Sequence, residues 1–479
     1  MGHDSMTRGT PHPRTRRIYA NRTLNLRSIK AIGYDMDYTL IHYKVDEWER
    51  SAFEHARAKL IAAGLPMEDA QFDPKSVIRG LIIDRQLGNL IKTNRFGYVK
   101  TAAHGTRMLD FEELRRAYSR SIVDLGDSRW MFLNTLFSIS EAALYLELVD
   151  RFDKGLIDAR IGYRGLYDAV KSAMDGAHME GQLKAEIIAD PDRFVELDPD
   201  LPLTLLDQKQ SGKRLALITN SEWHYTVPIM NYAFNRYLPE GMTWRNLFDI
   251  VIVGARKPDF FASRQPTFEV VEPERGLLVP LVGGLEIGKC YFGGHAELIE
   301  QVFKVPGEQI LYIGDHVYTD VRVSKAIRRW RTALILRELE EELDALASIE
   351  ATQTELGRLM AKKTELESQL SEIRLAMQRK KGSYGPEVKE SIRELDAEFS
   401  RNRAQAIELD ELIGPLAHVA GEVHNQRWGL LMRAGNDKSH MARHVERHAD
   451  VYTSRVSNFL VATPFVYLRS VRGSLPHDP

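Results

Sequence analysis

An apolar run that ends in two closely spaced carboxylates is the feature that most constrains how this chain folds. Residues 29–34 are apolar except for one lysine, and Asp35 and Asp37 follow directly. A short run of this kind predicts a buried strand. Residues i and i+2 of a strand face the same way, so both carboxylates would leave the strand end on one side. Two acids this close repel each other unless a cation separates them or one is protonated.

Both ways of relieving that repulsion suit phosphoryl transfer. A magnesium ion bound by Asp35 would offset its charge, and Asp37 could carry the proton that a leaving alcohol needs. The alternative is a strand that simply ends in a solvated acidic turn. The other strand ends of the chain favour the first interpretation.

Two further apolar runs end in groups that can bind phosphate. Residues 214–221 end in Thr219, whose hydroxyl can donate to a phosphate together with the backbone N–H groups beyond it. Residues 248–259 place Lys257 beside a proline, where its ammonium can bind phosphate oxygens as a point charge. Taken alone, the first could equally be a helix cap and the second a solvated lysine.

A fourth apolar run, residues 309–320, stops at Gly314, and Asp315 and Asp320 lie across the turn into the next predicted helix. The glycine lets the backbone approach the site closely, and Asp315 could complete a magnesium shell with Asp35. A capped strand-to-helix turn is the alternative. Strands that alternate with helices predict a parallel α/β sheet, which binds ligands at the carboxyl ends of its strands. We therefore expect all four strand ends to converge on one site.

Composition limits the other classes of function. The chain has 479 residues, 43% of them apolar, which predicts two or three domains with their own cores. Lys and Arg number 65 against 67 Asp and Glu, so no global field draws the protein to nucleic acid or to a membrane. The single cysteine, Cys290, excludes an intramolecular disulfide and predicts a cytoplasmic location.

Between these motifs the chain carries further predicted elements. Residues 45–64 have the spacing of an amphipathic helix, and three β-prone runs between 79 and 100 predict a small meander outside the main sheet. Residues 110–188 are mostly helical in pattern. Residues 337–380 predict a long charged helix, and a turn leads from it to a second such helix, forming an antiparallel hairpin. That hairpin is either an oligomer or partner surface or a self-packed appendage.

The four strand ends, in their order, resemble the motifs of the haloacid dehalogenase superfamily. Their residues and order most resemble those of the cytosolic purine 5′-nucleotidase family, the type that prefers IMP and GMP. The resemblance covers roughly residues 18–336 and the tail from Trp428, and leaves the helical hairpin outside. Supporting short motifs begin at Asn21, Arg79, Gly88, Ala103, Asn134, Gly293 and Ile313.

The resemblance implies a mechanism with a covalent intermediate. Asp35 would be the nucleophile that forms an aspartyl-phosphate, although spacing alone does not choose between nucleophile and metal ligand. Asp37 would protonate the departing ribose 5′-oxygen and then take a proton from the hydrolytic water. Magnesium would be held by the Asp35 carboxylate, the Asp37 backbone carbonyl and Asp315, with Asp320 as support. The phosphoryl oxygens would be held by Thr219, Asn220 and Lys257.

The long segment between the first two motifs, residues 41–200, is expected to be a cap that excludes water and selects the leaving group. By the same resemblance, Phe137 would stack on the purine, although its apolar neighbours also suit a core aromatic. Asp175, His178 and Lys184 would make the polar contacts to base and sugar.

Two positions depart from the animal members of this family. Lys171 stands where those enzymes have an arginine, and Met179 replaces an aromatic residue. A lysine lacks the bidentate fork of arginine, so this departure weakens the implied preference for a 6-oxopurine. Activation by nucleotide effectors, known in animal members of the family, is not expected for this chain from the resemblance.

The sequence thus predicts a magnesium-dependent purine nucleoside 5′-monophosphatase, which could also transfer phosphate to a nucleoside and which we expect to be a homo-oligomer. One alternative is a phosphatase of the same chemistry acting on another phosphometabolite. The other is a nucleotide-responsive scaffold whose hairpin recruits a partner. The expected organisation is a flexible start (1–20), a Rossmann-like core (21–40 and 201–336), a cap (41–200), the hairpin (337–413) and a C-terminal segment packed on the core (414–479).

Overall fold

The computed structural model describes residues 13–179, 181–272 and 275–471, which form two compact units. The first unit combines the described residues up to Glu340 with those from Leu431 onward, and the second is Glu341–Leu430. The predicted cap, residues 41–200, shares the first unit with the predicted core. Residues 1–12 of the predicted flexible start lie outside the described residues, and within the rest of that start Tyr19–Ala20 form strand β1.

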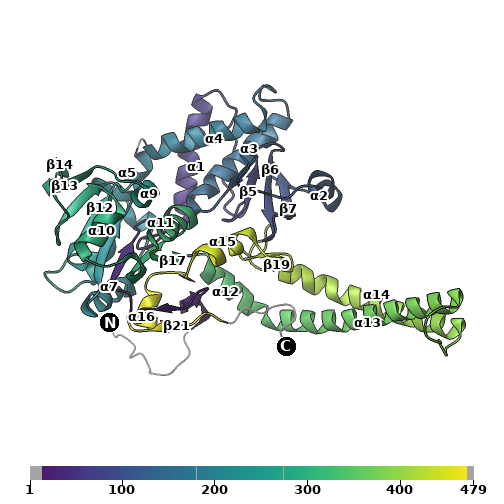
Figure 1. The fold of residues 1–479 in the computed structure, drawn as a ribbon. Helices are drawn as coiled ribbons and strands as arrows, with labels where there is room; N and C mark the ends of the chain where they lie inside the picture. Colours follow the sequence, from purple (N-terminus) through teal and green to yellow (C-terminus); the bar gives the residue numbers. More distant parts are fainter. Residues whose placement is uncertain (1–12, 180, 273–274, 472–479) are drawn as a thin grey trace. The chain divides into compact units, whose positions relative to one another are not determined.

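A ten-stranded, mainly parallel sheet is the centre of the first unit (Figure 1). Neighbouring strands from β20 to β15 run parallel, and β1, β13 and β14 add antiparallel pairs at the two edges. This confirms the predicted α/β fold with a parallel sheet. The strands lie in the order β1, β20 (Val451–Thr453), β17 (Arg331–Ile335), β16 (Ile310–Gly314), β3 (Ala31–Tyr34), β11 (Arg214–Ile218), β12 (Ile250–Val253), β15 (Cys290–Gly293), β13 (Thr267–Glu272) and β14 (Leu277–Pro280).

The four strands predicted to carry the site are β3, β11, β12 and β16, and they lie next to one another in the sheet. In β3, Ile32 is the register partner of both Leu215 and Leu311, so the strand that precedes Asp35 lies between β11 and β16. Strand β15 was missed, because its four residues are followed by glycine rather than by a side chain that marks a strand end.

Helices cover both faces of the centre of this sheet, which explains why its central strands are mainly apolar. On one face, α9 (Asp259–Ala262) and α10 (Ala296–Phe303) share a buried cluster with side chains of β11, β12 and β16. On the other face, the Tyr34 hydroxyl donates to the Gln208 side chain of α7 (Asp200–Gln210).

The segment between the first two motifs builds a second, antiparallel sheet with its own helices. Helix α1 (Val45–Ala62) packs against α3 (Ile139–Asp153) and α4 (Gly162–Met179). The predicted meander is confirmed and is part of a five-stranded sheet. Residues 110–188 are mostly helical, as predicted. One β-prone Trp-Met-Phe run among them forms β9 (Trp130–Phe132), which pairs with β5 (Ile82–Asp84) and was not predicted. The strand order is β8 (Arg107–Met108), β7 (Val99–His104), β6 (Asn89–Thr93), β5 (Ile82–Asp84) and β9 (Trp130–Phe132).

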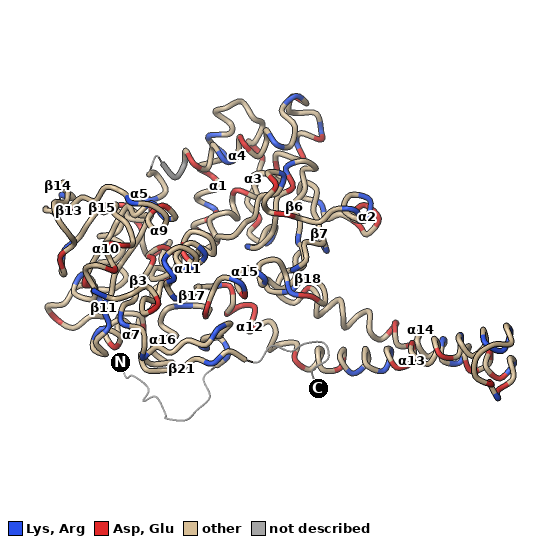
Figure 2. Tube along the Cα trace, in the orientation of Figure 1, with Lys and Arg blue, Asp and Glu red and all other residues tan. Residues whose placement is uncertain are grey.

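The second unit consists mainly of two long helices, α13 (Glu350–Gly382) and α14 (Ile392–Glu422). Pairing of Lys363 with Asp410 and of Gln369 with Asn402 shows that they run antiparallel, which confirms the predicted hairpin. Figure 2 shows acidic and basic residues interspersed along α13, whereas residues 404–422 of α14 carry acidic side chains but no Lys or Arg. The single helix predicted from residue 337 is instead interrupted at Ile349, where α12 (Leu339–Ser348) ends and α13 begins.

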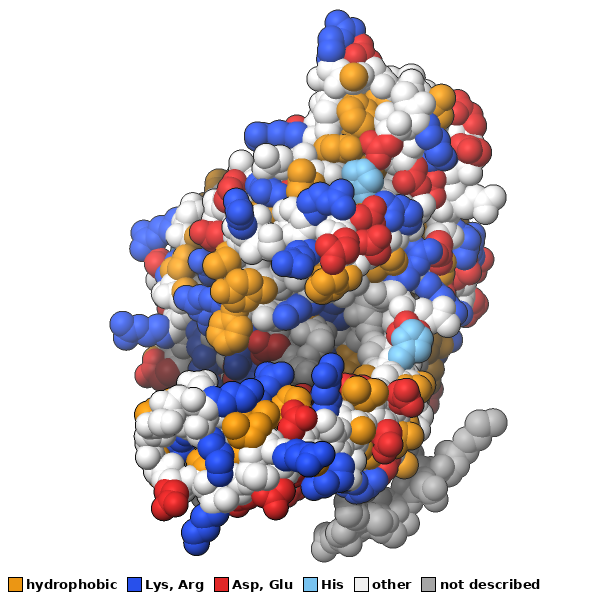
Figure 3. Space-filling model, turned by 90° about the vertical axis from the view of Figure 1, so that its right-hand side faces the viewer, with side chains coloured by type: hydrophobic (Ala, Val, Ile, Leu, Met, Phe, Trp, Pro, Cys, Tyr) orange, Lys and Arg blue, Asp and Glu red, His pale blue; other side chains and the backbone are white. Residues whose placement is uncertain are grey.

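The surface carries both signs of charge. On the face shown in Figure 3, Lys and Arg side chains are interspersed with Asp and Glu side chains, in keeping with the near balance of 65 and 67. In the part of the chain that the structure describes, every helix is too short or too polar to cross a lipid bilayer.

Asp450 attaches the C-terminal segment to the main sheet. Its buried carboxylate lies 2.5 Å from Lys325 Nζ and 3.0 Å from Arg331 Nε, and it accepts the Thr332 N–H at 3.0 Å. Burial by itself raises the pKa of Asp450, but the two cations outweigh burial, so the pKa lies below its usual value. A carboxylate with a depressed pKa stabilises the fold above its unfolded-state pKa and loses that contribution as the pH falls.

We therefore expect Asp450→Ala to lower the free energy of unfolding by roughly 2–4 kcal/mol at pH 7, because it leaves two cations and a buried N–H without their acceptor. Urea unfolding followed by circular dichroism measures this. The difference from wild type should shrink below about pH 4 as the carboxylate is protonated. Glu446→Ala, which removes an exposed ion pair with Lys438, should change stability by less than about 1 kcal/mol. Equal effects of the two substitutions would contradict this role of Asp450.

Candidate active site

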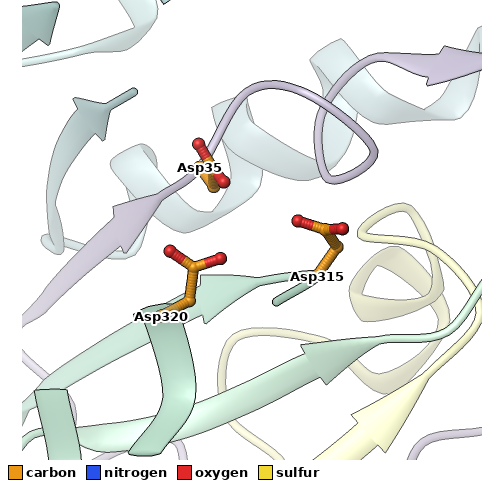
Figure 4. Close-up of side chains that lie close together, drawn as sticks. All are labelled: Asp35, Asp315 and Asp320. Carbon is orange, nitrogen blue, oxygen red and sulfur yellow. The ribbon is translucent and has the colours of Figure 1, made fainter. Parts of the chain in front are cut away.

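Three carboxylates from two segments converge at the carboxyl ends of β3 and β16. Asp35 follows β3, Asp315 follows β16, and Asp320 lies in the π-helix η6 (Val317–Arg322). One oxygen of each lies within 4.8 Å of the others, and Figure 4 shows the three side chains around a shared space. Their residues are 8%, 4% and 0% exposed, so the charges are removed from water.

The ammonium of Lys257 lies between two of these acids. Its Nζ is 2.7 Å from Asp35 Oδ1 and 2.9 Å from Asp320 Oδ1, and it donates to the Tyr312 hydroxyl at 3.1 Å. Burial alone lowers the pKa of Lys257, but Asp320 and Asp35 outweigh burial and raise it well above its usual value. The ammonium therefore stays charged and offsets one of the negative charges.

The turn after β16 depends on Gly314, as expected from the sequence. A Cβ atom at this position would lie 2.6 Å from Asp320 Oδ2, which is closer than real Cβ contacts allow. Asp320 Oδ2 also accepts the His316 N–H at 3.1 Å, which fixes the carboxylate against the turn. A larger residue at 314 would push Asp320 away from Lys257.

The buried negative charge of the cluster must be offset by protons or by a cation. Burial raises the pKa of Asp35 well above its usual value, with Lys257 opposing the rise and Asp320 adding to it. Burial likewise raises the pKa of Asp315 to about 7, against the effect of Arg79. Asp315 Oδ2 is buried and, among the described residues, accepts no hydrogen bond. Carboxylate oxygens without partners are ligands that a hard cation such as Mg²⁺ prefers, so these residues fit the expected metal.

Asp37 is held by two hydroxyl groups beside the acidic cluster. Tyr43 donates to Asp37 Oδ1 at 2.5 Å, and Ser221 donates to Asp37 Oδ2 at 2.6 Å. The Tyr43 and Tyr225 hydroxyls are themselves 2.8 Å apart. Lys184 Nζ donates to Ser221 Oγ at 3.3 Å and lies 4.9 Å from the centre of the Tyr225 ring. Lys184, predicted as a substrate contact, therefore lies next to the group that holds Asp37.

The end of β11 combines with the loop that carries Lys257. Thr219 is fully buried, and its Oγ1 accepts the Ser221 N–H at 3.0 Å, which leaves its hydroxyl hydrogen available to donate. Asn220 Oδ1 accepts the Lys257 N–H at 2.7 Å, and Asn220 Nδ2 donates to the Lys257 carbonyl at 3.2 Å. Asn220 thus fixes the backbone of Lys257, while the Lys257 side chain reaches the acids.

The predicted base-binding residues have different surroundings. The half-buried Phe137 lies in the short 3-10 helix η2 (Leu136–Ser138), with its ring centre 4.7 Å from that of Tyr38. Asp175 is exposed on α4 and pairs with Lys171 at 3.8 Å, and none of its described contacts reaches the acidic cluster. The side chains of His178 and Met179 lie outside the described residues.

Several residues of the site were not predicted to take part. Tyr43, Ser221 and Tyr312 touch Asp37 or Lys257, and Arg79 donates from Nη2 to the Asp315 carbonyl and from Nε to the Asn134 carbonyl. Ser221 follows the Thr-Asn pair directly and Arg79 begins one of the matched motifs, so both had a local signal. Tyr43 and Tyr312 had none, because strand tyrosines are usually core residues.

A separate cavity of about 970 Å³ is lined by cations and aromatic rings, together with apolar side chains and the two acids Asp124 and Asp127. It contains none of the three carboxylates. Cations and aromatic rings together suit an anionic ligand with an aromatic group. The lining includes Arg85, Arg322, Arg443, Arg447, Trp130, Phe132, Tyr318, His440, His444 and His448.

Known proteins similar to this chain indicate the family to which it belongs. A family model described as the 5′ nucleotidase family matches residues 18–479. A 5′-nucleotidase domain-containing protein of Dictyostelium discoideum is 27% identical over 472 residues, which are 96% of this chain and 74% of that protein. Human 5′-nucleotidase domain-containing protein 2 is 31% identical over 343 residues, which are 68% of this chain and 64% of that protein. The chain therefore spans about three quarters of the first relative and just under two thirds of the second.

Among solved structures, a haloacid dehalogenase-like family hydrolase from Xanthomonas campestris is 14% identical and covers 64% of this chain and 82% of its own. Its TM-score is 0.25, which is too low to carry an argument. The fold assignment rests on the sheet order of this chain itself.

If the three carboxylates bind a divalent cation, Mg²⁺ at saturating concentration should raise the melting temperature of the wild-type protein by roughly 2–6 °C, because a ligand stabilises the state that binds it. Asp315→Asn should lose most of that rise. Asp158→Asn removes an exposed carboxylate that contacts Arg160 and serves as the control. Differential scanning calorimetry with and without Mg²⁺ gives the comparison, and an equal rise in all three proteins would argue against a metal site at Asp315.

Proposed function

The chain belongs to the 5′ nucleotidase family, as its resemblance predicted, and we propose that it hydrolyses purine nucleoside 5′-monophosphates to nucleoside and phosphate with Mg²⁺. The observation that carries this proposal is the convergence of Asp35 with Lys257, Asp315 and Asp320, with Asp37 two residues beyond the nucleophile. Three distant segments supply a nucleophile, an acid, a fixed cation and metal ligands within one site. Phosphoryl transfer needs this combination.

In the first step, Asp35 attacks phosphorus in line with the departing ribose oxygen. Its Oδ1 already accepts the Met36 N–H at 2.7 Å and pairs with Lys257, so Oδ2 is the oxygen left to form the new P–O bond. The bond from phosphorus to the ribose 5′-oxygen breaks, and Asp37 gives that oxygen its proton. Lys257 and the Thr219 hydroxyl hold the phosphoryl oxygens as their charge changes.

A bound magnesium ion would supply positive charge to the phosphoryl group and to the acids. The residues that would hold it are the Asp35 and Asp315 carboxylates and the Asp37 carbonyl, with Asp320 in support. Asp320 also anchors the ammonium of Lys257, which links the cation site to the phosphate site.

In the second step, Asp37 takes a proton from a water molecule that attacks the phosphorus of the aspartyl-phosphate. The P–O bond to Asp35 breaks, and inorganic phosphate leaves with Asp35 restored. Asp37 must hold a proton in one step and lose it in the other. The hydroxyls of Tyr43 and Ser221 can act as donor or acceptor, so they can orient Asp37 in both states. A nucleoside in place of water would accept the phosphate in the same way.

The leaving group would lie on the side of the site formed by Phe137 and Lys184. Phe137 offers an aromatic face for a base, and Lys184 lies beside Ser221. A preference for IMP and GMP rests on the resemblance alone, since Lys171 pairs with Asp175 on the exposed side of α4. A cytoplasmic location and a homo-oligomeric assembly also stay predictions.

The second candidate is a nucleotide-responsive protein in which catalysis is secondary, and the cationic and aromatic cavity favours it. Nucleotide binding that is abolished by Arg447→Ala, in a wild-type protein that hydrolyses no phosphate ester, would support this alternative. A phosphatase of another phosphometabolite is distinguished by its substrate profile.

We expect wild-type protein to hydrolyse IMP or GMP faster than AMP, pyrimidine nucleotides or sugar phosphates, and only with Mg²⁺. Asp35→Asn should lower kcat by about 10³-fold or more, because the amide is a poor nucleophile and the covalent route is lost. Phosphate release across this panel, with and without Mg²⁺, is the measurement. Asp46→Asn, an exposed change on α1, is the matched control and should keep full activity. Negligible turnover of every purine nucleotide by wild type would reject the proposal.

A further inference from the structure

Glu49 is a buried acid that the proposed chemistry does not use. It lies on the inward side of α1 and is 0% exposed. Among the described residues, no Lys, Arg or His forms an ion pair with it. Burying a carboxyl group without a cation costs free energy, so a residue of this type needs a specific partner to be retained at such a position.

The partner of Glu49 is the start of another helix. Its Oε2 accepts the Ser140 N–H at 2.8 Å, and Ser140 is the second residue of α3. The first N–H groups of a helix have no acceptor within the helix, so Glu49 supplies one from α1. The contact therefore joins α1 to the N-terminus of α3.

Glu49 is mainly uncharged at neutral pH. Burial raises its pKa to about 8, with Ser140 opposing the rise and the neighbouring Glu141 carboxyl adding to it. The Tyr38 hydroxyl also faces Glu49, and its own pKa is raised, first by burial and then by Glu49. A glutamine at position 49 has nearly the same shape as the neutral acid and can still accept the Ser140 N–H.

The helix start that Glu49 holds carries Phe137, whose ring packs with those of Tyr38 and Trp48 to form an aromatic wall. Phe137 lies in η2, which leads directly into α3. Its ring centre is 4.7 Å from that of Tyr38 and 5.3 Å from that of Trp48. Tyr38 follows Asp37 directly and has a left-handed backbone with φ of 53°, so its position depends on the packing around it.

We infer that Glu49 is a positioning residue for the leaving group: by holding the Ser140 N–H, it fixes Phe137 and the aromatic wall beside Asp37. The inference rests on the proposed function, because that function identifies the leaving group as a nucleoside. Glu49 touches neither the phosphate site nor the acidic cluster in any described contact. Its loss should therefore weaken the recognition of the nucleoside and leave the binding of phosphate unchanged.

The test compares wild type, Glu49→Gln and Glu49→Leu by three constants, which are KM and kcat for the preferred nucleotide and the inhibition constant of inorganic phosphate. Glu49→Leu should raise KM about tenfold, because a misplaced binding group costs up to about 10²-fold. The kcat and the inhibition constant should stay within about twofold of wild type. Glu49→Gln should stay close to wild type in all three, since the hydrogen bond to Ser140 is kept.

A second pair of variants covers the case in which Glu49→Leu does not fold. Ser140→Pro removes the N–H donor together with the hydroxyl, in a first helical turn where proline is tolerated, and Ser140→Ala removes the hydroxyl alone and keeps that N–H. Ser140→Pro should raise KM as Glu49→Leu does, and Ser140→Ala should not. Unchanged KM in the variants without the hydrogen bond would overturn the inference, as would a parallel worsening of all three constants. If wild type hydrolyses no nucleotide, the proposed function itself fails.

Discussion

The burial of three carboxylates beside one ammonium is the constraint on which the rest of this site depends. Lys257 offsets part of the negative charge of Asp35 and Asp320, but Asp315 keeps a buried oxygen that accepts no hydrogen bond from any residue that the structure describes. Such an arrangement is stable only if protons or a cation compensate the remaining charge. The same excess of buried negative charge would favour the binding of a divalent cation in the proposed function. A phosphate ester, which carries negative charge itself, would then need both that cation and Lys257.

The parallel sheet is what allows these groups to meet. Residues from positions 35, 219, 257 and 315 are far apart in the sequence, yet each follows a strand of one sheet or the loop beyond it. Tyr312 shows how closely the core and the site are joined, because its hydroxyl accepts from Lys257 and donates to the Ile218 carbonyl at 3.1 Å. Changes in the apolar core next to Tyr312 would therefore alter the position of the Lys257 ammonium as well as stability.

The polar residues at the strand ends could be predicted from the sequence, but the side chains that surround them could not. Asp35, Lys257 and Asp315 could be predicted because apolar runs that stop at polar residues have a direct physical meaning in a parallel sheet. Tyr43 could not, because only the folded chain brings its hydroxyl to Asp37. The substrate role predicted for Asp175 came from resemblance and not from a physical pattern. In the structure Asp175 lies exposed on α4 beside Lys171. Side-chain partners that depend on loop geometry leave no periodic signal in the sequence.

The central claim is that Asp35 forms a covalent bond to phosphorus. Its most direct test is to mix the protein with a nucleotide labelled in its 5′-phosphate, quench the reaction with acid within one turnover, and locate the label by mass spectrometry. The account predicts a phosphorylated peptide that contains Asp35 and is missing from the Asp35→Asn protein. Turnover of the nucleotide without any labelled peptide, or with the label on a different residue, would contradict it.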